Sequence, residues 1–119
     1  MYIYSFEKLE VWQLSRRLCA DIYTLTRNFP KEEMYGLSSQ IRRASVSIAS
    51  NIAEGTSRST DKDKAHFSTL AFSSLMEVLN QLIIATDLGY LENEKLLELR
   101  KFINELGNKL NALKKSQLS

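Results

Sequence analysis

Apolar residues recur three or four positions apart along most of this 119-residue sequence. The spacing is most regular through Leu96, Leu99, Ile103, Leu106, Leu110 and Leu113. Because an α-helix makes one turn every 3.6 residues, this spacing puts the apolar side chains on one face of a helix. A single proline and four glycines leave long stretches without a helix breaker. The pattern predicts an all-α fold.

Four segments with this spacing are predicted as helices, over residues 6–28, 38–54, 61–88 and 94–115. The expected N-caps are Ser38 or Ser39, Thr60 and Asn93, and the glycines expected just beyond helix ends are Gly55 and Gly89. Short connections favour antiparallel neighbours. We therefore expect residues 1–119 to form one domain, an antiparallel up-down-up-down four-helix bundle.

The apolar faces of the helices define the expected core. In the first helix the face comprises Val11, Trp12, Leu14, Leu18, Cys19, Ile22, Tyr23 and Leu25. In the third helix it comprises Phe67, Leu70, Ala71, Leu75, Val78, Leu79, Leu82 and Ala85. Each face is broad enough to contact two neighbouring helices, as a bundle requires.

Charge and cysteine content narrow the class of protein. The formal net charge is only +2, so the chain lacks the basic excess expected of a protein that coats nucleic acid as a monomer. Cys19 is the only cysteine, which excludes a disulfide framework and a cysteine-based metal site. The longest aliphatic runs, such as residues 82–85, are far shorter than the roughly 20 residues of a membrane span. We expect a cytoplasmic protein that does not enter a membrane.

The second helix divides its residues into two sides. Its core-facing residues are Ile41, Ala44, Ser45, Ile48, Ala49 and Ile52. The other side carries a continuous set that we call the polar stripe: Arg43, Ser47, Ser50, Asn51 and Glu54. Arg42 lies apart, between Ala49 and Ala53 on a face of small residues. Its side chain must therefore emerge beside a neighbouring helix.

The short side chains of the polar stripe favour close contact with another surface. A solvated helix face usually carries long Lys, Glu and Gln side chains, which are good helix formers, whereas this one carries serine and asparagine. A plain solvated face is the alternative. We interpret the polar stripe, together with Arg42, as a subunit interface or a partner-binding surface.

Arginines from the first two helices offer a second interpretation. The arginines that can form a basic strip, if these helices are neighbours, are Arg16, Arg17, Arg42, Arg43 and Arg58. Arginine suits bidentate contacts with phosphate, and an oligomer would multiply each local cluster. The strip is a candidate for binding RNA or DNA, with surface salt bridging as the alternative.

No pattern in the sequence predicts an active site. His66 is the only histidine and has no cysteine or second histidine to complete a metal site. Seven residues lie between Arg58 and His66, across an expected loop, which argues against the arginine–histidine spacing of helical RNases. No phosphate-binding glycine loop is present. We expect no catalytic residues, metal or cofactor, and an unmotivated nuclease site is the weakest of three hypotheses.

Several motifs together resemble a known family. They are Phe6 to Trp12, Phe29-Pro30 with Glu33, Tyr35 to Leu37, Gln40 to Ala44, Ser47-Ile48, Asn51 to Gly55, Ser74-Leu75 with Glu77, and Leu88 to Leu91. The sequence resembles the four-helix-bundle proteins encoded in intervening sequences of bacterial 23S ribosomal RNA genes. The resemblance covers nearly the full length.

The resemblance implies a small bacterial bundle that assembles into a homopentameric ring and has no established enzymatic activity. It also implies kinship with the accessory proteins of diversity-generating retroelements, which share the bundle and the pentamer and bind nucleic acid and a reverse transcriptase. The expected partners are therefore further copies of the chain, with RNA, DNA or another protein such as a reverse transcriptase as alternatives.

Overall fold

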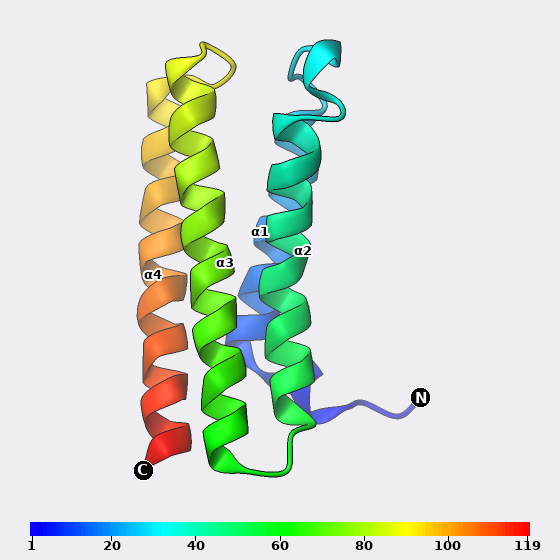
Figure 1. The fold of residues 1–119 in the computed structure, drawn as a ribbon, viewed down its shortest axis with the longest axis vertical. Coiled ribbons are helices and arrows are strands. Elements are labelled where there is room, and N and C mark those ends of the chain that lie inside the picture. Colours follow the sequence, from blue (N-terminus) through cyan, green and yellow to red (C-terminus); the bar gives the residue numbers. More distant parts are fainter.

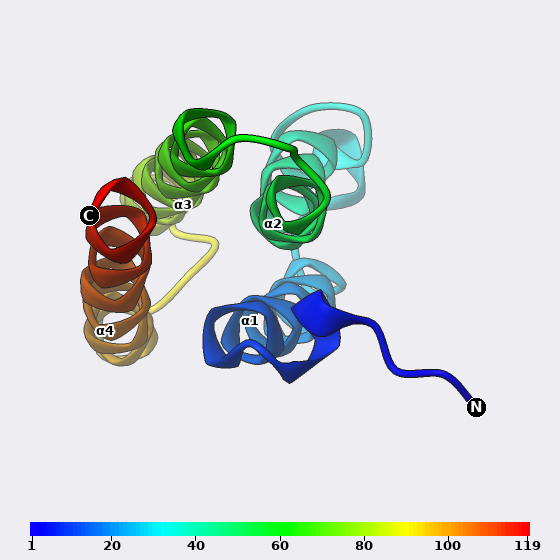
Figure 2. The ribbon, with the colours of Figure 1, turned by 90° about the horizontal axis from the view of Figure 1, so that it is seen from below.

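Four long helices alternate in direction in the computed structural model, which describes residues 1–119 (Figure 1). They are α1 (Glu10–Thr26), α2 (Leu37–Thr56), α3 (Asp61–Asp87) and α4 (Asn93–Leu118), with short 3-10 turns η1 (Ser5–Lys8) and η2 (Lys31–Glu33) before α1 and α2. Seen end-on, the helices occupy the corners of a square, with α1 beside α2 and α3 beside α4 (Figure 2). The expected all-α, up-down-up-down four-helix bundle is confirmed.

The core lies between the four helices and consists mainly of leucine and isoleucine. Its largest fully buried members are Leu18, Ile22, Ile41, Ile48, Leu75, Leu82, Ile103, Leu106 and Leu110. Burying each such side chain is worth roughly 1.5–3 kcal/mol relative to leaving it exposed. α3 packs against both α2 and α4, whereas α1 packs mainly against α2. α1 and α4 are joined at the surface by an ion pair of 3.0 Å between Lys109 Nζ and Glu10 Oε1.

Two residues expected in the core lie at the surface instead. Tyr23 is 38% exposed and Leu70 is 36% exposed. Their neighbours Ile22 and Ala71 are fully buried, and consecutive residues on a helix point about 100° apart. The register that buries the neighbour therefore turns Tyr23 and Leu70 outward.

The first helix begins later than expected. α1 starts at Glu10 rather than at Phe6, because Leu9 adopts an extended conformation with φ −75° and ψ 129°. Phe6 belongs to η1, and its ring meets the ring of Trp12 edge-on at a centroid distance of 5.1 Å. Phe6, whose position fits the apolar spacing of the first helix, thus packs on the bundle from a separate 3-10 turn.

Two of the expected N-caps are wrong. α2 begins at Leu37, so neither serine caps it, and Ser38 is buried in the first turn. Glu33 Oε1 accepts a hydrogen bond of 3.2 Å from the backbone N–H of Leu37 and takes over this role. Asn93 is the first residue of α4 rather than its cap. The sequence shows polar residues near the starts of α2 and α4, but it does not show at which residue each helix begins.

The ends of α3 agree with the sequence. The Oγ1 of Thr60 accepts a hydrogen bond of 3.1 Å from the backbone N–H of Asp63, as expected for an N-cap. Beyond the C-terminal end, Gly89 has φ 81°, a conformation that favours glycine. The backbone N–H of Tyr90 donates to the carbonyl of Ala85 at 2.9 Å, which completes a Schellman motif.

Gly55 has a different role from the one expected. It lies inside α2, which continues to Thr56, and it is buried. A Cβ at this position would lie 2.9 Å from the Cβ of Phe67 and 3.7 Å from the carbonyl oxygen of Lys64. The glycine therefore allows α2 and α3 to approach each other closely where the chain turns between them.

α3 has the length and composition of a membrane-crossing helix, with 27 residues and a mean hydropathy of 1.3 over its most apolar window. The sequence-based expectation considered only continuous runs of aliphatic residues and did not consider the mean hydropathy of the whole helix. A third of that window (33%) is buried inside the bundle, and Ala71, Leu75, Val78, Leu82 and Ala85 of α3 are fully buried against the other helices.

Candidate interaction surface

Arg42 is held against α1. Its Nε donates a hydrogen bond of 2.7 Å to Thr26 Oγ1, and its guanidinium carbon lies 4.9 Å from the ring centroid of Tyr23. Thr26 is buried, and its hydroxyl also donates to the carbonyl of Ile22 at 2.8 Å. The expectation that Arg42 emerges beside a neighbouring helix is confirmed. The sequence analysis did not identify its partner Thr26, because a small polar residue at the end of the first helix gives no sign of a contact with another helix.

Part of the polar stripe faces α3. The hydroxyls of Ser47 and Ser74 lie 3.0 Å apart and form a hydrogen bond between α2 and α3. The Nδ2 of Asn51 donates to the carbonyl of Ser47 at 2.9 Å and to its Oγ at 3.1 Å. Both α2 residues are half-buried. The Ser47–Ser74 hydrogen bond therefore stabilises the contact between α2 and α3, and Asn51 bonds to the Ser47 hydroxyl from within α2.

The rest of the polar stripe is exposed. Arg43, Ser50 and Glu54 point outward from α2, and neither charged side chain forms a salt bridge. The structure thus separates residues that the helical wheel had grouped. Ser47 bonds to α3, Asn51 bonds back to Ser47 within α2, and the remaining three are free to meet another molecule.

An apolar groove of about 380 Å³ runs between α1 and α2. Its lining residues are Trp12, Arg16, Cys19, Ala20, Val46, Ala49, Ser50 and Ala53. The α2 side is shallow because alanine, serine and valine line it, and the wide Trp12 ring forms the α1 side. We call this depression the α1–α2 groove. The sequence analysis noted the small residues around Arg42 but did not identify the groove.

A second depression of about 460 Å³ adjoins the α1–α2 groove. It is lined by Tyr23, Met34, Tyr35, Ser39, Arg42, Arg43 and Val46, and it shares Val46 with the groove. Tyr35 is 92% exposed, Met34 53% and Val46 42%. The two depressions make a continuous surface on α1 and α2 that presents apolar side chains beside arginines.

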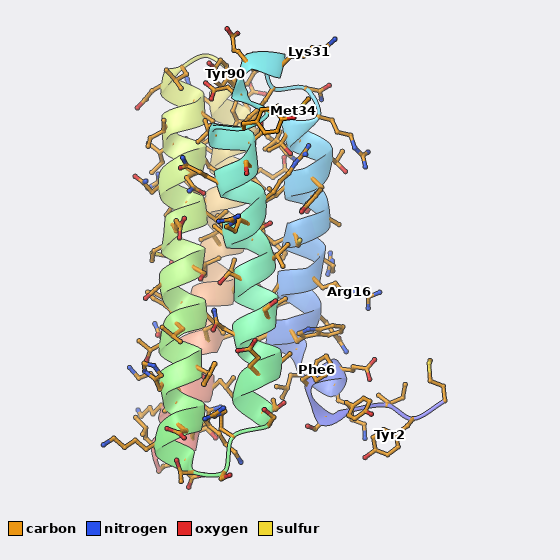
Figure 3. The ribbon with its side chains drawn as sticks, turned by 45° about the vertical axis from the view of Figure 1, so that its right-hand side comes forward. Tyr2, Phe6, Arg16, Lys31, Met34 and Tyr90 are labelled. Carbon is orange, nitrogen blue, oxygen red and sulfur yellow. The ribbon has the colours of Figure 1, made fainter.

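The structure brings together some of the arginines of the expected basic strip. Arg16 lines the α1–α2 groove, points into solvent (Figure 3), and has its guanidinium carbon 5.3 Å from the centroid of the Trp12 ring. Arg42 and Arg43 line the adjoining depression, whereas Arg17 lines neither.

Arg58 is engaged elsewhere. It lies over the ring of Phe67 at 5.3 Å and within 3.8 Å of Asp63 Oδ2. His66 is exposed beside the same ring, with centroids 6.0 Å apart. The structure gathers no group of three histidine, cysteine, aspartate or glutamate side chains that could hold a metal ion.

A larger open groove of about 520 Å³ lies between α3 and α4 and was not anticipated. Its floor includes Phe72 and Met76, and α4 contributes Arg100, Lys101, Asn104, Asn108 and Asn111. No acidic residue lines it, and none of these α4 side chains forms a salt bridge within the chain. The asparagines of α4 recur at helical spacing, and this spacing could have identified the face from the sequence.

Comparisons with known proteins agree with the fold. A model of the 23S rRNA-intervening sequence protein family matches residues 7–112 of the chain. The structure is similar to the crystal structure of a protein of unknown function from the S23 ribosomal protein family of Bacteroides thetaiotaomicron, with a TM-score of 0.78 at 21% identity. This match covers 88% of this chain and 98% of that chain. No curated protein matches the sequence significantly.

Proposed function

The chain belongs to the 23S rRNA-intervening sequence protein family, and on that premise we propose that it is a non-enzymatic, cytoplasmic assembly module. In this proposal several identical bundles form a closed ring, with five subunits as the expected number. The α1–α2 groove and its adjoining depression form the contact, together with the exposed part of the polar stripe.

The observation that carries the proposal is the apolar surface left open on α1, α2 and the connection between them. Tyr23, Met34, Tyr35 and Val46 are each more than a third exposed and line one continuous pair of depressions. Soluble monomers rarely leave large apolar patches in water, and such patches commonly mark protein contacts. A second subunit would remove this surface from water.

The charges around this surface suit a specific contact. Arg43 and Glu54 are exposed on α2 without partners inside the chain. In a head-to-tail contact each subunit offers two different surfaces, so opposite charges on α2 can pair with complementary groups of the next copy. Such contacts close into a ring when the rotation between subunits allows it.

Light scattering on the purified protein at micromolar concentration tests the proposal. We expect a single species of oligomeric mass. Arg43→Glu should dissociate it more readily than Arg100→Glu, which makes the same charge change on an exposed site of α4 away from the α1–α2 groove. A monomeric wild-type protein, or equal effects of the two variants, would remove the proposed interface.

Nucleic-acid binding is the second candidate function. It is favoured by arginines and lysines that lie on open grooves without a carboxylate partner, Arg16 and Arg43 on α1 and α2 and Arg100 and Lys101 on α4. Such cations can pair with phosphates. Because the net charge is only +2, we rank nucleic-acid binding below assembly as a proposed function.

A further inference from the structure

The first four residues form an extended arm that leaves the bundle. Residues 1–4 belong to no helix and lead sideways away from the square of helices (Figure 2), with Tyr2 to the right of the lower part of the bundle in Figure 3. Met1, Tyr2, Ile3 and Tyr4 are exposed by 110%, 77%, 42% and 61%. These four residues, which we call the N-terminal arm, are an unusually apolar segment to leave in water.

The base of the N-terminal arm is fixed although its side chains are free. The backbone N–H of Tyr4 donates a hydrogen bond of 2.7 Å to Glu7 Oε2. The rings of Tyr2 and Tyr4 meet edge-on at 4.9 Å, and Phe6 is anchored on Trp12. These contacts, together with stacking of the Tyr4 ring on Phe6 at 6.4 Å, direct the arm outward and leave its side chains exposed.

The α1–α2 groove of the same chain matches the arm in length. An extended segment of four residues spans about 13 Å. From Trp12 to Cys19 the groove follows α1 for seven residues, which is about 10 Å at the rise of an α-helix. The alanines on its α2 side leave room for side chains as large as tyrosine or isoleucine.

The groove also matches the arm in chemistry. Arg16 lines the groove and Arg42 lines the adjoining depression, and they already lie over the aromatic rings of Trp12 and Tyr23. Arginine binds aromatic faces through cation–π contacts, so the exposed Arg16 in an apolar groove suits a tyrosine-containing segment. Arg43, exposed and without a carboxylate partner, adds a further cation on this side.

We propose that the N-terminal arm of one copy of the chain docks in the α1–α2 groove of the next copy. The occupant is another copy because Phe6, packed beside the groove at Trp12, sends its own arm away from the bundle. Each copy then gives one arm and receives one, which is a head-to-tail contact that can close a ring. This inference rests on the proposed assembly function and names the segment that joins the subunits.

Disulfide trapping tests the contact, because Cys19 is the only cysteine and lines the groove. The variant Ile3→Cys places a second thiol in the arm. Copper–phenanthroline is the oxidant: two Cu(II) ions take one electron each as the S–S bond forms, and the two thiol protons go to the buffer. We expect a ladder of linked chains on a non-reducing gel. The ladder should disappear when Cys19→Ser is added.

Each outcome of the trapping experiment decides a different point. A disulfide within one chain would show that the arm folds back on its own groove and would overturn the inference. An oligomer by light scattering that forms no Cys19-dependent ladder would overturn the arm contact while leaving the assembly proposal intact. A wild-type protein that is monomeric by light scattering would overturn both.

A second pair of variants measures the strength of the contact without a new bond. Tyr2→Ser combined with Ile3→Ser should raise the dissociation constant of the oligomer by about tenfold or more, because burying one such side chain is worth at least about that factor. The control Leu97→Ser removes a 65% exposed side chain from α4, far from the arm, and should change the constant by less than about twofold. Equal changes in the two variants would contradict the inference.

Discussion

Arg42 Nε donates a hydrogen bond of 2.7 Å to Thr26 Oγ1, and this contact ties α2 to α1. The buried hydroxyl of Thr26 would lose its charged partner in Arg42→Ala, and the ring of Tyr23 would lose the guanidinium that lies over it. We expect the free energy of unfolding to fall by about 1–2 kcal/mol. Urea denaturation followed by circular dichroism, at one protein concentration, measures the change.

The neighbouring residue is the matched control for this substitution. Arg43 is exposed and forms no hydrogen bond or salt bridge in the chain, so Arg43→Ala should alter the free energy of unfolding by less than about 0.5 kcal/mol. A double-mutant cycle with Thr26→Val should show coupling between Arg42 and Thr26. Additive losses would mean that the hydrogen bond contributes nothing to stability.

Gly55→Ala should destabilise the bundle, because the added Cβ would lie 2.9 Å from the Cβ of Phe67. That atom is fixed close to the α3 backbone, so the two helices must move apart, and we expect a loss of about 1–3 kcal/mol. Gly107→Ala is the control, since its Cβ would meet only side-chain atoms, the ring edge of Phe72 at 3.2 Å and Cδ2 of Leu75 at 3.6 Å, beside an open groove.

Thermal unfolding of both glycine variants makes the comparison. In Gly107→Ala the gain in helix propensity, about 1 kcal/mol, should offset most of the strain. A midpoint that falls no further for Gly55→Ala than for Gly107→Ala would show that α2 and α3 have room for a side chain at their closest approach.

The isoleucines and the glycine of α2 show what the sequence can predict and what it cannot. The period of Ile41, Ile48 and Ile52 predicted a buried face, because burial of aliphatic residues follows local spacing. Gly55 was taken for the residue beyond a helix end, since glycine is common there. Its actual role depends on the distance to Phe67, which only the packing of α2 on α3 determines.

The polar residues of the candidate surface illustrate the same limit. The helical wheel gave the direction of Arg42 correctly, but it could not supply Thr26 or Ser74 as hydrogen-bond partners because these belong to other helices. The α1–α2 groove likewise depends on how the small residues of α2 face Trp12. Helix directions follow from the sequence, whereas contacts between helices require their relative register.

Tyr90 should make the stability of the protein depend on pH in the alkaline range. Its hydroxyl donates to Glu33 Oε2 at 2.9 Å, joining the α3–α4 connection to η2 (Figure 3). This hydrogen bond, partial burial and the negative charges of Glu33 and Glu32 raise the pKa of Tyr90 above its ordinary value of 10.0. Above that pH the unfolded chain releases the proton before the folded one, so stability falls as pH rises.

Tyr90→Phe isolates this effect. Below pH 10.0 the wild type should be the more stable protein, and its advantage should shrink as pH rises through the raised pKa of Tyr90. Ultraviolet titration should show one of the five tyrosines of the wild type ionising after the others, and this late step should be missing from the variant. Tyr35→Phe, at a 92% exposed site, serves as the control. Identical alkaline unfolding of all three proteins would contradict a role for the Tyr90–Glu33 hydrogen bond.

Nucleic-acid binding, if it occurs, should depend on salt in proportion to the cations that contact phosphate. Each such contact with a single strand adds about 0.7 to the slope of log affinity against log salt. Fluorescence anisotropy with a labelled oligouridine between about 50 and 200 mM salt measures this slope. Replacing Arg16 by alanine should lower it by that amount, because Arg16 points into solvent and has no carboxylate partner. Lys31→Ala, at the top of the bundle in Figure 3 and away from Arg16, should leave the slope unchanged. No binding at the lowest salt, or equal slopes for the wild type and Arg16→Ala, would count against phosphate contacts by Arg16.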